Sequence, residues 1–215
     1  MNPSEVKRLI EEALYRAYED TNRFSNLPPN EVHVTEITYC LRKAYYARMS
    51  QSKPPIDKVT ILQLGRALHE LIQKYVRNHE IHSELEVTYP FREITLHGTI
   101  DLLVDGTIIE LKTVSKKPQN IYPHHYAQVN AYYHMLRDAG YDVSEPVYVV
   151  YINKRTGEVK IFSAIPAQND FMVTLMRAYQ LYNCLLQRRL PAPEPSHLCE
   201  YCEFRMECSL NGESK

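Results

Sequence analysis

Two acids and a lysine lie close together around a sharp turn near the middle of the chain. Asp101 falls late in one apolar stretch, Asp105-Gly106 follows it, and Glu110 and Lys112 stand two apart in the next stretch. An Asp-Gly pair between apolar stretches is typical of a two-residue β-hairpin turn. Antiparallel pairing about that turn places Asp101 opposite Glu110, and the alternation of a strand puts Lys112 on the same face as Glu110.

Facing carboxylates repel each other unless a cation lies between them. Hard oxygen ligands completed by water suit Mg²⁺ or Mn²⁺. The ammonium of Lys112 beside such an ion would orient a water molecule and stabilise charge that develops on a phosphate. This chemistry is phosphodiester hydrolysis, with Asp101, Glu110 and Lys112 as the catalytic group. An ordinary exposed strand face with weak cross-strand pairs fits the same pattern, and these residues alone leave both interpretations open.

A second group of reactive side chains consists of four cysteines. One stands alone near the N-terminus and three form a Cys-x2-Cys-x5-Cys pattern near the C-terminus: Cys40, Cys199, Cys202 and Cys208. Clustered thiols in a cytoplasmic protein indicate zinc or an iron–sulfur cluster rather than disulfides. Zinc sites commonly use two close pairs, so the isolated first cysteine favours the cluster only mildly. The fifth, Cys184, lies in an apolar helical pattern and is expected to pack in the core.

Composition limits the class of protein. The 215 residues are 44% apolar with a net charge of −1, which indicates one domain with a core and gives no overall basic field for nucleic acid. We find no apolar run of transmembrane length and no signal peptide, so a cytoplasmic location without membrane attachment is expected. Any DNA contact must then be local.

Two stretches without acidic residues offer such a contact. Residues 37–56 and 111–137 contain several lysines and arginines and no Asp or Glu. We expect Arg42 and Lys43 in the first, and Lys116 and Lys117 in the second, to border a DNA path. Chance clustering on a solvated face is the alternative.

The elements that must position these groups follow from hydrophobic periodicity. A first amphipathic helix is followed by a second that starts near Thr35 and carries Cys40, and by a long third helix that contains Gly65 and His69. Strands are expected over 84–91, 94–104, 107–114, 147–153 and 159–164, with helices over 126–139 and 171–189. The order predicts an α/β fold, a mixed sheet flanked by helices.

Four short motifs in this framework occur in a recognisable order. They are Gly65-x-x-x-His69, Gly98-x-x-Asp101, Glu110-x-Lys112 and Gln128-x-x-x-Tyr132. The series resembles the RecB-like branch of the PD-(D/E)xK nucleases, which have a restriction-endonuclease-like core.

The resemblance implies a role for each motif residue. His69, Asp101 and Glu110 would be metal ligands, with the backbone carbonyl of Leu111 as a further one, and Lys112 would be the catalytic lysine. Gln128 and Tyr132 would position DNA. On its own each signal has a plainer alternative, since a lone histidine on a helix is usually packed or exposed, and residues four apart in a helix often form a structural pair.

The cysteines narrow the resemblance further. Joined to the nuclease motifs, they resemble the CRISPR-associated RecB-like exonucleases, the fourth Cas protein family, over about residues 35–208. That family holds a [4Fe–4S] cluster with one cysteine before the nuclease core and three after it. The resemblance implies a nuclease core at about 56–190 and an iron–sulfur region formed by about 30–55 and 191–212, within a single domain of 1–215. Leu41 stands where the family commonly has proline.

The activity implied by this family is hydrolysis of single-stranded DNA from an end with 5′ to 3′ polarity. Its cellular role would be processing of DNA for new CRISPR spacers, with a Cas1-like integrase as partner. A RecB-like repair nuclease outside CRISPR systems is the nearest alternative. A catalytically inactive iron–sulfur DNA-binding module is another, although every acid, the lysine and the histidine of the motifs are present.

Overall fold

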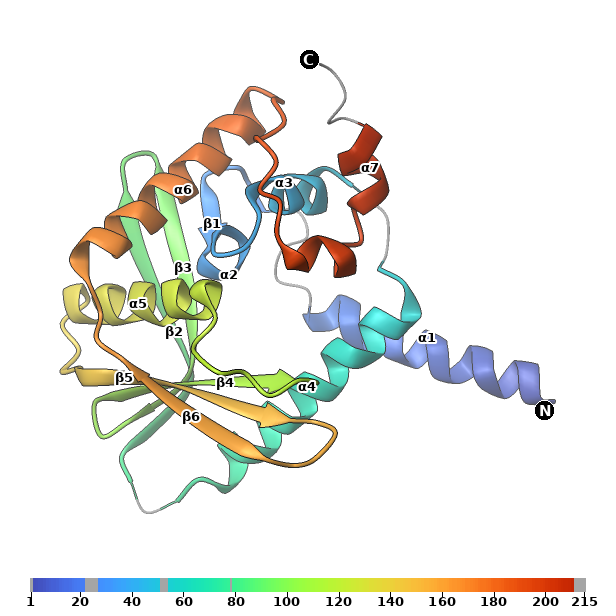
Figure 1. Ribbon diagram of the computed structural model, residues 1–215, viewed down its shortest axis with the longest axis horizontal. Helices are drawn as coiled ribbons and strands as arrows, with labels where there is room; N and C mark the ends of the chain where they lie inside the picture. Colours follow the sequence, from blue (N-terminus) through green and yellow to red (C-terminus); the bar gives the residue numbers. More distant parts are fainter. Residues whose placement is uncertain (1, 22–26, 51–53, 78, 211–215) are drawn as a thin grey trace.

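The chain folds around a mixed six-stranded sheet that is flanked by helices (Figure 1). The computed structural model describes residues 2–21, 27–50, 54–77 and 79–210, so residues 51–53 and 211–212 of the expected iron–sulfur region lie outside the described residues. The strands are β1 (Glu31–His33), β2 (Ile81–Phe91), β3 (Ile94–Val104), β4 (Thr107–Val114), β5 (Ser144–Asn153) and β6 (Val159–Ala164). Their order is β1-β3-β4-β5-β6, and β2 pairs with β3. The predicted fold class is confirmed.

Strand β3 is the centre of this arrangement. Antiparallel β2 pairs with it from Ile94 to Val104. On its other edge, parallel β1 pairs with residues 95–97 and antiparallel β4 with residues 102–104. Residues 98–101 therefore have no strand neighbour on that edge within the described ranges. Gly98 and Asp101 both lie in this gap, where other elements can approach the strand.

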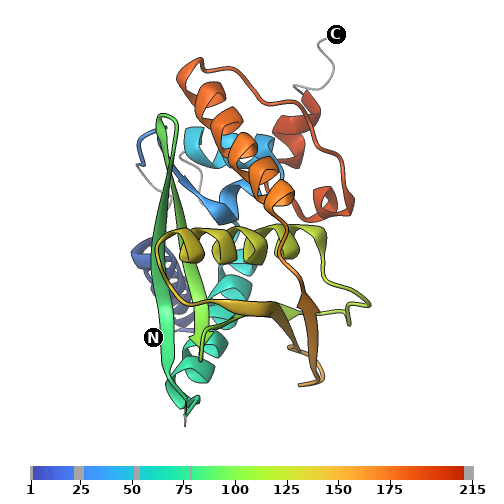
Figure 2. The same cartoon turned by 90° about the vertical axis from the view of Figure 1, so that its left-hand side faces the viewer.

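Helices pack against the sheet, and some of them lie next to this gap. The helix α5 (Pro123–Asp138) packs on the sheet, and α6 (Gln168–Leu186) packs on α5 (Figures 1 and 2). The helix α4 (Ile56–Tyr75) contacts β3 and β4, and α1 (Pro3–Thr21) contacts α4 and projects from the body of the molecule (Figure 1). The core includes Leu96, Ile100, Ile108, Val129, Tyr132, Met135, Tyr151 and Phe171.

The expected helix through Cys40 is in fact two short helices with Cys40 between them. The helix α2 covers Val34–Ile37, α3 covers Leu41–Met49, and Cys40 precedes α3 in an extended conformation (φ −74°, ψ 123°). Arg177 of α6 explains the break, because its guanidinium donates to the carbonyls of Ile37 at 2.8 Å and of Tyr39 at 2.5 Å. Those carbonyls, at and beyond the end of α2, therefore have a partner without a continuing helix.

Two short helices lie beyond the predicted elements, at the C-terminal end. The 3-10 helix η1 covers His197–Tyr201 and α7 covers Arg205–Leu210, and both lie near α3 (Figure 1). Among the described helices, none combines the length and the apolar composition that a membrane crossing requires.

Candidate active site

The predicted hairpin brings the two acids to the point where its strands part. Val104 pairs with Thr107 as expected, but the β3–β4 ladder stops at Leu102 and Ile109. Beyond that point β4 keeps its pairing with β5 on the other edge, which extends from Thr107 to Val114. Where the ladder between β3 and β4 has stopped, the Asp101 side chain connects the two strands, because its Oδ2 accepts the backbone N–H of Leu111 at 2.8 Å. This bond fixes the orientation of the Asp101 carboxyl group and leaves its other oxygen, Oδ1, on the side of His69.

Glu110 is the most buried charged side chain of the group, with 2% of its surface exposed. Its Oε1 accepts from Lys112 Nζ at 2.7 Å and from Gln128 Nε2 at 2.7 Å, whereas Oε2 is buried with no hydrogen-bond partner among the described residues. Burial and the repulsion from Asp101 raise the pKa of Glu110 to about 7, although Lys112 acts against the shift. A buried carboxylate oxygen without a donor calls for a proton, a water molecule or a cation.

Lys112 remains charged in these surroundings. Burial lowers the pKa of its ammonium, but attraction from the carboxylates of Glu110 and Asp101 outweighs it, so the pKa lies above its usual value. The side chain keeps 19% of its surface exposed. A charged ammonium that reaches solvent beside the acids can donate hydrogen bonds to a phosphate or to a water molecule.

His69 faces the same acids from α4. Its Nδ1 lies 3.6 Å from Asp101 Oδ1, which is beyond hydrogen-bond distance and close enough for a shared ion. Gly65, one turn earlier, allows this approach, because a Cβ added there would lie 3.2 Å from Thr113 Oγ1 on β4. The first glycine motif thus sets the distance between helix and strand.

Gln73 is a further residue of the site, and sequence reasoning missed it. Its Nε2 donates to the backbone carbonyl of Asp101 at 3.1 Å and to Glu84 Oε1 at 2.8 Å. Glu84, opposite Asp101, has a positive φ of 50°, and the β2–β3 register skips this pair. Gln73 stands one helical turn after His69, on the same face of α4. That spacing was the available signal.

Gln128 and Tyr132 approach Glu110 from inside the fold. Both are buried, and Gln128 Nε2 donates to Glu110 and to the hydroxyl of Tyr132, the latter at 2.9 Å. A Cβ on Gly98 would lie 2.9 Å from the Tyr132 ring, which explains that glycine. These contacts hold Glu110 in place, and a direct contact of the pair with DNA stays a prediction.

The available donor atoms are typical of a site for a hard divalent cation. Among the described residues, they do not form a site in which protein side chains fill every coordination position. Within the described ranges no three His, Cys, Asp or Glu side chains are grouped as metal ligands. The available atoms are His69 Nδ1, Asp101 Oδ1 and Glu110 Oε2, beside the carbonyl of Leu111. One or two carboxylates, completed by water and substrate phosphate, are how Mg²⁺ is usually held. The residues present therefore fit Mg²⁺ or Mn²⁺.

Comparison with known proteins decides the family. The sequence profile described as the PD-(D/E)XK nuclease superfamily matches residues 12–209. The chain belongs to this superfamily. The crystal structure of SSO0001 is 20% identical, with a TM-score of 0.71, and the alignment covers 93% of this chain and 95% of that one, which shows a shared fold. A candidate exonuclease from Eubacterium rectale is 13% identical, with a TM-score of 0.45 over 81% of this chain and 94% of that one. No curated protein matches the sequence significantly.

The basic residues expected on a DNA path of this PD-(D/E)XK nuclease differ in exposure. Arg42 is buried at 6% exposure, and its Nε donates to the carbonyl of Pro191 at 2.8 Å. The structure therefore places Arg42 inside the molecule, since its guanidinium supports the C-terminal segment. Lys43 is partly exposed, and Lys116 and Lys117 are exposed, with Lys117 paired to Glu158. These three lysines remain accessible to a phosphate backbone.

The cysteine-bearing segments from the two ends of the nuclease lie against each other. Lys43 Nζ is 3.3 Å from Glu203, Lys58 donates to the carbonyl of Tyr201 at 2.6 Å, and the rings of Tyr46 and Phe204 stack at 5.6 Å. Arg42 Nη1 lies 3.8 Å from Cys208 Sγ. The five cysteines, Cys40, Cys184, Cys199, Cys202 and Cys208, form no disulfide.

Two of these thiols have a backbone N–H donor beside them. The backbone N–H of Ser196 donates to Cys199 Sγ at 3.4 Å, and the backbone of Phe204 lowers the pKa of Cys202 against the larger effect of burial. Backbone donors to sulfur are a known feature of cysteine-held clusters. Within the described ranges the four thiols are not grouped as metal ligands, so a four-thiolate cluster stays a prediction.

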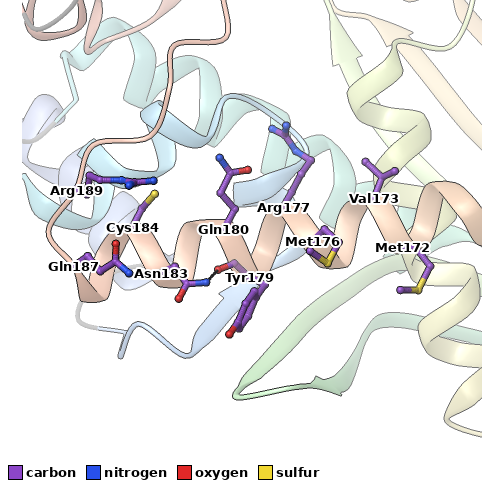
Figure 3. A pocket seen from close by; sticks show the side chains of 10 residues that line it. All are labelled: Met172, Val173, Met176, Arg177, Tyr179, Gln180, Asn183, Cys184, Gln187 and Arg189. Carbon is purple, nitrogen blue, oxygen red and sulfur yellow. Dashed lines mark hydrogen bonds between the residues drawn. The ribbon is translucent and has the colours of Figure 1, made fainter. Parts of the chain in front are cut away.

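A pocket of about 590 Å³ lies elsewhere, along α6 (Figure 3). Its lining includes Met172, Met176, Arg177 and Cys184. None of the candidate catalytic residues lines it. The acids of this nuclease instead lie where α4 and α5 approach the point at which β3 and β4 part.

Proposed function

We propose that the protein is a divalent-metal-dependent deoxyribonuclease whose active site is formed by Asp101, Glu110 and Lys112. The observation that carries this proposal is the buried, unpartnered Oε2 of Glu110, next to a charged lysine and a second carboxylate. A neutral structural network would satisfy that oxygen internally. A cation would satisfy it and would also replace the proton that the raised pKa favours near pH 7.

His69, Asp101, Glu110 and the carbonyl of Leu111 would hold the ion. A bound Mg²⁺ or Mn²⁺ supplies positive charge that offsets the charge developing on the phosphate. Lys112 donates hydrogen bonds from its ammonium to the phosphate or to the attacking water. Gln128 holds Glu110 Oε1, and Gln73 holds the Asp101 backbone, so the acids keep their geometry when substrate arrives.

The substrate and pathway extend this proposal. The four motifs and the cysteine pattern support an exonuclease that acts on single-stranded DNA with 5′ to 3′ polarity and that processes DNA for new CRISPR spacers. A Cas1-like integrase would be its partner in that pathway. The intact motif residues and their mutual hydrogen bonds argue against an inactive DNA-binding module.

A [4Fe–4S] cluster held by Cys40, Cys199, Cys202 and Cys208 is part of the same proposal. Its support is the contact between the segments that carry these thiols and the backbone donor on Cys199. The cluster would be structural, because joining residue 40 to residues 199–208 closes a loop of about 160 residues, and long loops restrict the unfolded chain most.

End-labelled oligonucleotides test the function. Protein purified without oxygen is incubated with single-stranded DNA labelled at the 5′ or the 3′ end, with Mg²⁺, Mn²⁺ or EDTA. We expect cleavage only with metal, and early release of short products from the 5′ label. Cleavage that persists in EDTA would contradict metal dependence. Early release of short products from the 3′ label would reverse the proposed polarity, and internal cuts would replace exonuclease by endonuclease action.

A further inference from the structure

A group of rings beside Lys112 has no part in the chemistry described above. Tyr39 comes from the turn before Cys40, and Tyr122 and His124 come from the start of α5. The ring centroids of Tyr39 and His124 lie 4.5 Å apart, and those of Tyr122 and His124 lie 5.6 Å apart with planes only 13° from parallel. All three side chains are partly exposed.

Two buried side chains hold this group from behind. His125 Nδ1 and the hydroxyl of Tyr151 are 2.9 Å apart, and the Tyr151 hydroxyl also accepts the backbone N–H of Tyr122 at 3.0 Å. The hydroxyl of Tyr39 lies 3.3 Å from His125 Nε2. The Tyr39 side chain and the backbone at the start of α5 are therefore held in place before any ligand arrives, which reduces the entropic cost of binding.

The rings adjoin the catalytic lysine and carry no charge themselves. Lys112 of β4 pairs with Tyr151 of β5, so the two side chains lie on the same face of the sheet and the lysine adjoins the residues that Tyr151 holds. Burial and the charge of Lys112 lower the pKa of His124 to about 4, so its imidazole is neutral at neutral pH. Neutral aromatic faces beside an ammonium offer a stacking surface and a phosphate contact side by side.

We propose that Tyr39, Tyr122 and His124 form a stacking platform for the base of a nucleotide adjacent to the cleaved phosphate. This proposal rests on the proposed nuclease function. It adds which part of the DNA substrate is recognised, namely the base of one nucleotide. Every base has a π face, so such a platform tolerates any sequence, but it requires a base that is unstacked from its neighbours. The platform would therefore select single-stranded DNA at the position of cleavage.

Binding measured without cleavage tests the platform. In EDTA, the affinity of the full chain is measured for a set of single-stranded oligonucleotides in which one base at a time is replaced by an abasic site. We expect a loss of about tenfold at one or two adjacent positions. His124→Leu and Tyr122→Leu should weaken binding of the intact strand by about the same factor and remove the position dependence. His124→Phe, which keeps a ring, should retain it.

Tyr141→Leu is the matched control, because Tyr141 is an exposed tyrosine just beyond the other end of α5. An equal loss at every position in the unmodified protein, or a position dependence that survives both leucine variants, would overturn the platform. The same protein is then given Mg²⁺ or Mn²⁺. Cleavage by a protein whose affinity is the same for every abasic position refutes the platform alone. Absence of both binding and cleavage refutes the proposed nuclease function as well.

Discussion

The catalytic face and the cysteine-bearing face of the molecule are held in different ways. Asp101 and Glu110 are 9% and 2% exposed, and hydrogen bonds from Leu111 and Gln128 fix their carboxyl groups. Cys199 is exposed, and its segment is joined to the N-terminal part by contacts such as that of Lys43 with Glu203, whose side chains are 43% and 22% exposed. The acids are thus positioned by the fold itself, whereas exposed ion pairs of this kind contribute little.

This difference implies two kinds of failure when residues are changed. Removing a catalytic group should abolish activity and leave the fold intact. Removing a cysteine should loosen the two ends and reach the chemistry only indirectly, through Tyr39, which adjoins Cys40 and contacts His124 and His125 near Lys112.

The largest effect is expected at the lysine and at the most buried acid. Lys112→Ala and Glu110→Ala should each lower the cleavage rate by about 10³-fold or more, because each removes charge that acts on the phosphate or on the ion. The melting temperature should change little by comparison. Rates with Mn²⁺ and thermal melts check both statements. Lys117→Ala, which removes an exposed lysine, is the control, and a similar loss there would show that the assay reports general charge.

The next effect concerns the cysteines. Cys40→Ala should remove the brown colour and iron of anaerobic protein, lower the melting temperature by roughly 5–10 °C and impair cleavage, since it removes a long cross-link. Cys184→Ala should keep the iron and the colour. Iron and acid-labile sulfide analysis gives the direct measurement, with about four irons per chain expected. One zinc and no iron would replace the cluster with a zinc site.

A smaller and conditional effect is expected at His69. His69→Ala should weaken cleavage mainly through lower metal affinity, because Asp101 and Glu110 keep their own hydrogen bonds. Rate measurements over a range of Mn²⁺ concentration should therefore show partial recovery at high metal. If the maximal rate falls and no metal concentration restores any of it, the imidazole acts in the chemistry rather than as a ligand.

The smallest effect is expected at the exposed lysines. Changing Lys116 and Lys117 to Glu should lower affinity for single-stranded DNA and flatten its salt dependence, by roughly 0.7 in slope for each phosphate that is no longer neutralised. Binding in EDTA at several salt concentrations gives the slope. An unchanged slope would place the DNA path on another face. Arg42 is not a suitable probe, because its guanidinium is buried against Pro191.

The catalytic hairpin was predictable from sequence because its signals are local. The Asp105-Gly106 turn and the alternation on both sides gave the bounds of β3 and β4 as the structure has them. Strand β1, with three residues, is too short to produce a periodic signal. Local pattern thus defined the elements that carry the acids.

Contacts between distant segments were beyond such reasoning. Arg177 interrupts the predicted helix around Cys40 from 137 positions further along the chain (177 − 40). The contact of Gln128 with Glu110 depends on the packing of α5 on β4, and the role of Gln128 in positioning DNA stays a prediction. The spacing from His69 places Gln73 on the face of α4 that carries the histidine, but its bond to the Asp101 carbonyl, beside the pair that the β2–β3 register skips, depends on tertiary packing.

The central claim, a metal-bound nuclease site at the parting of β3 and β4, is tested most directly by Asp101→Asn against Asp105→Asn. The asparagine at 101 keeps an oxygen for the Leu111 N–H and removes the charge that an ion requires, whereas Asp105 is exposed and bonded to His79. Mn²⁺ binding and DNA cleavage are measured on the same preparations. We expect Asp101→Asn to lose both with an unchanged melting temperature, and Asp105→Asn to keep both. Full cleavage by Asp101→Asn, in an assay free of contaminating nuclease, would contradict the account.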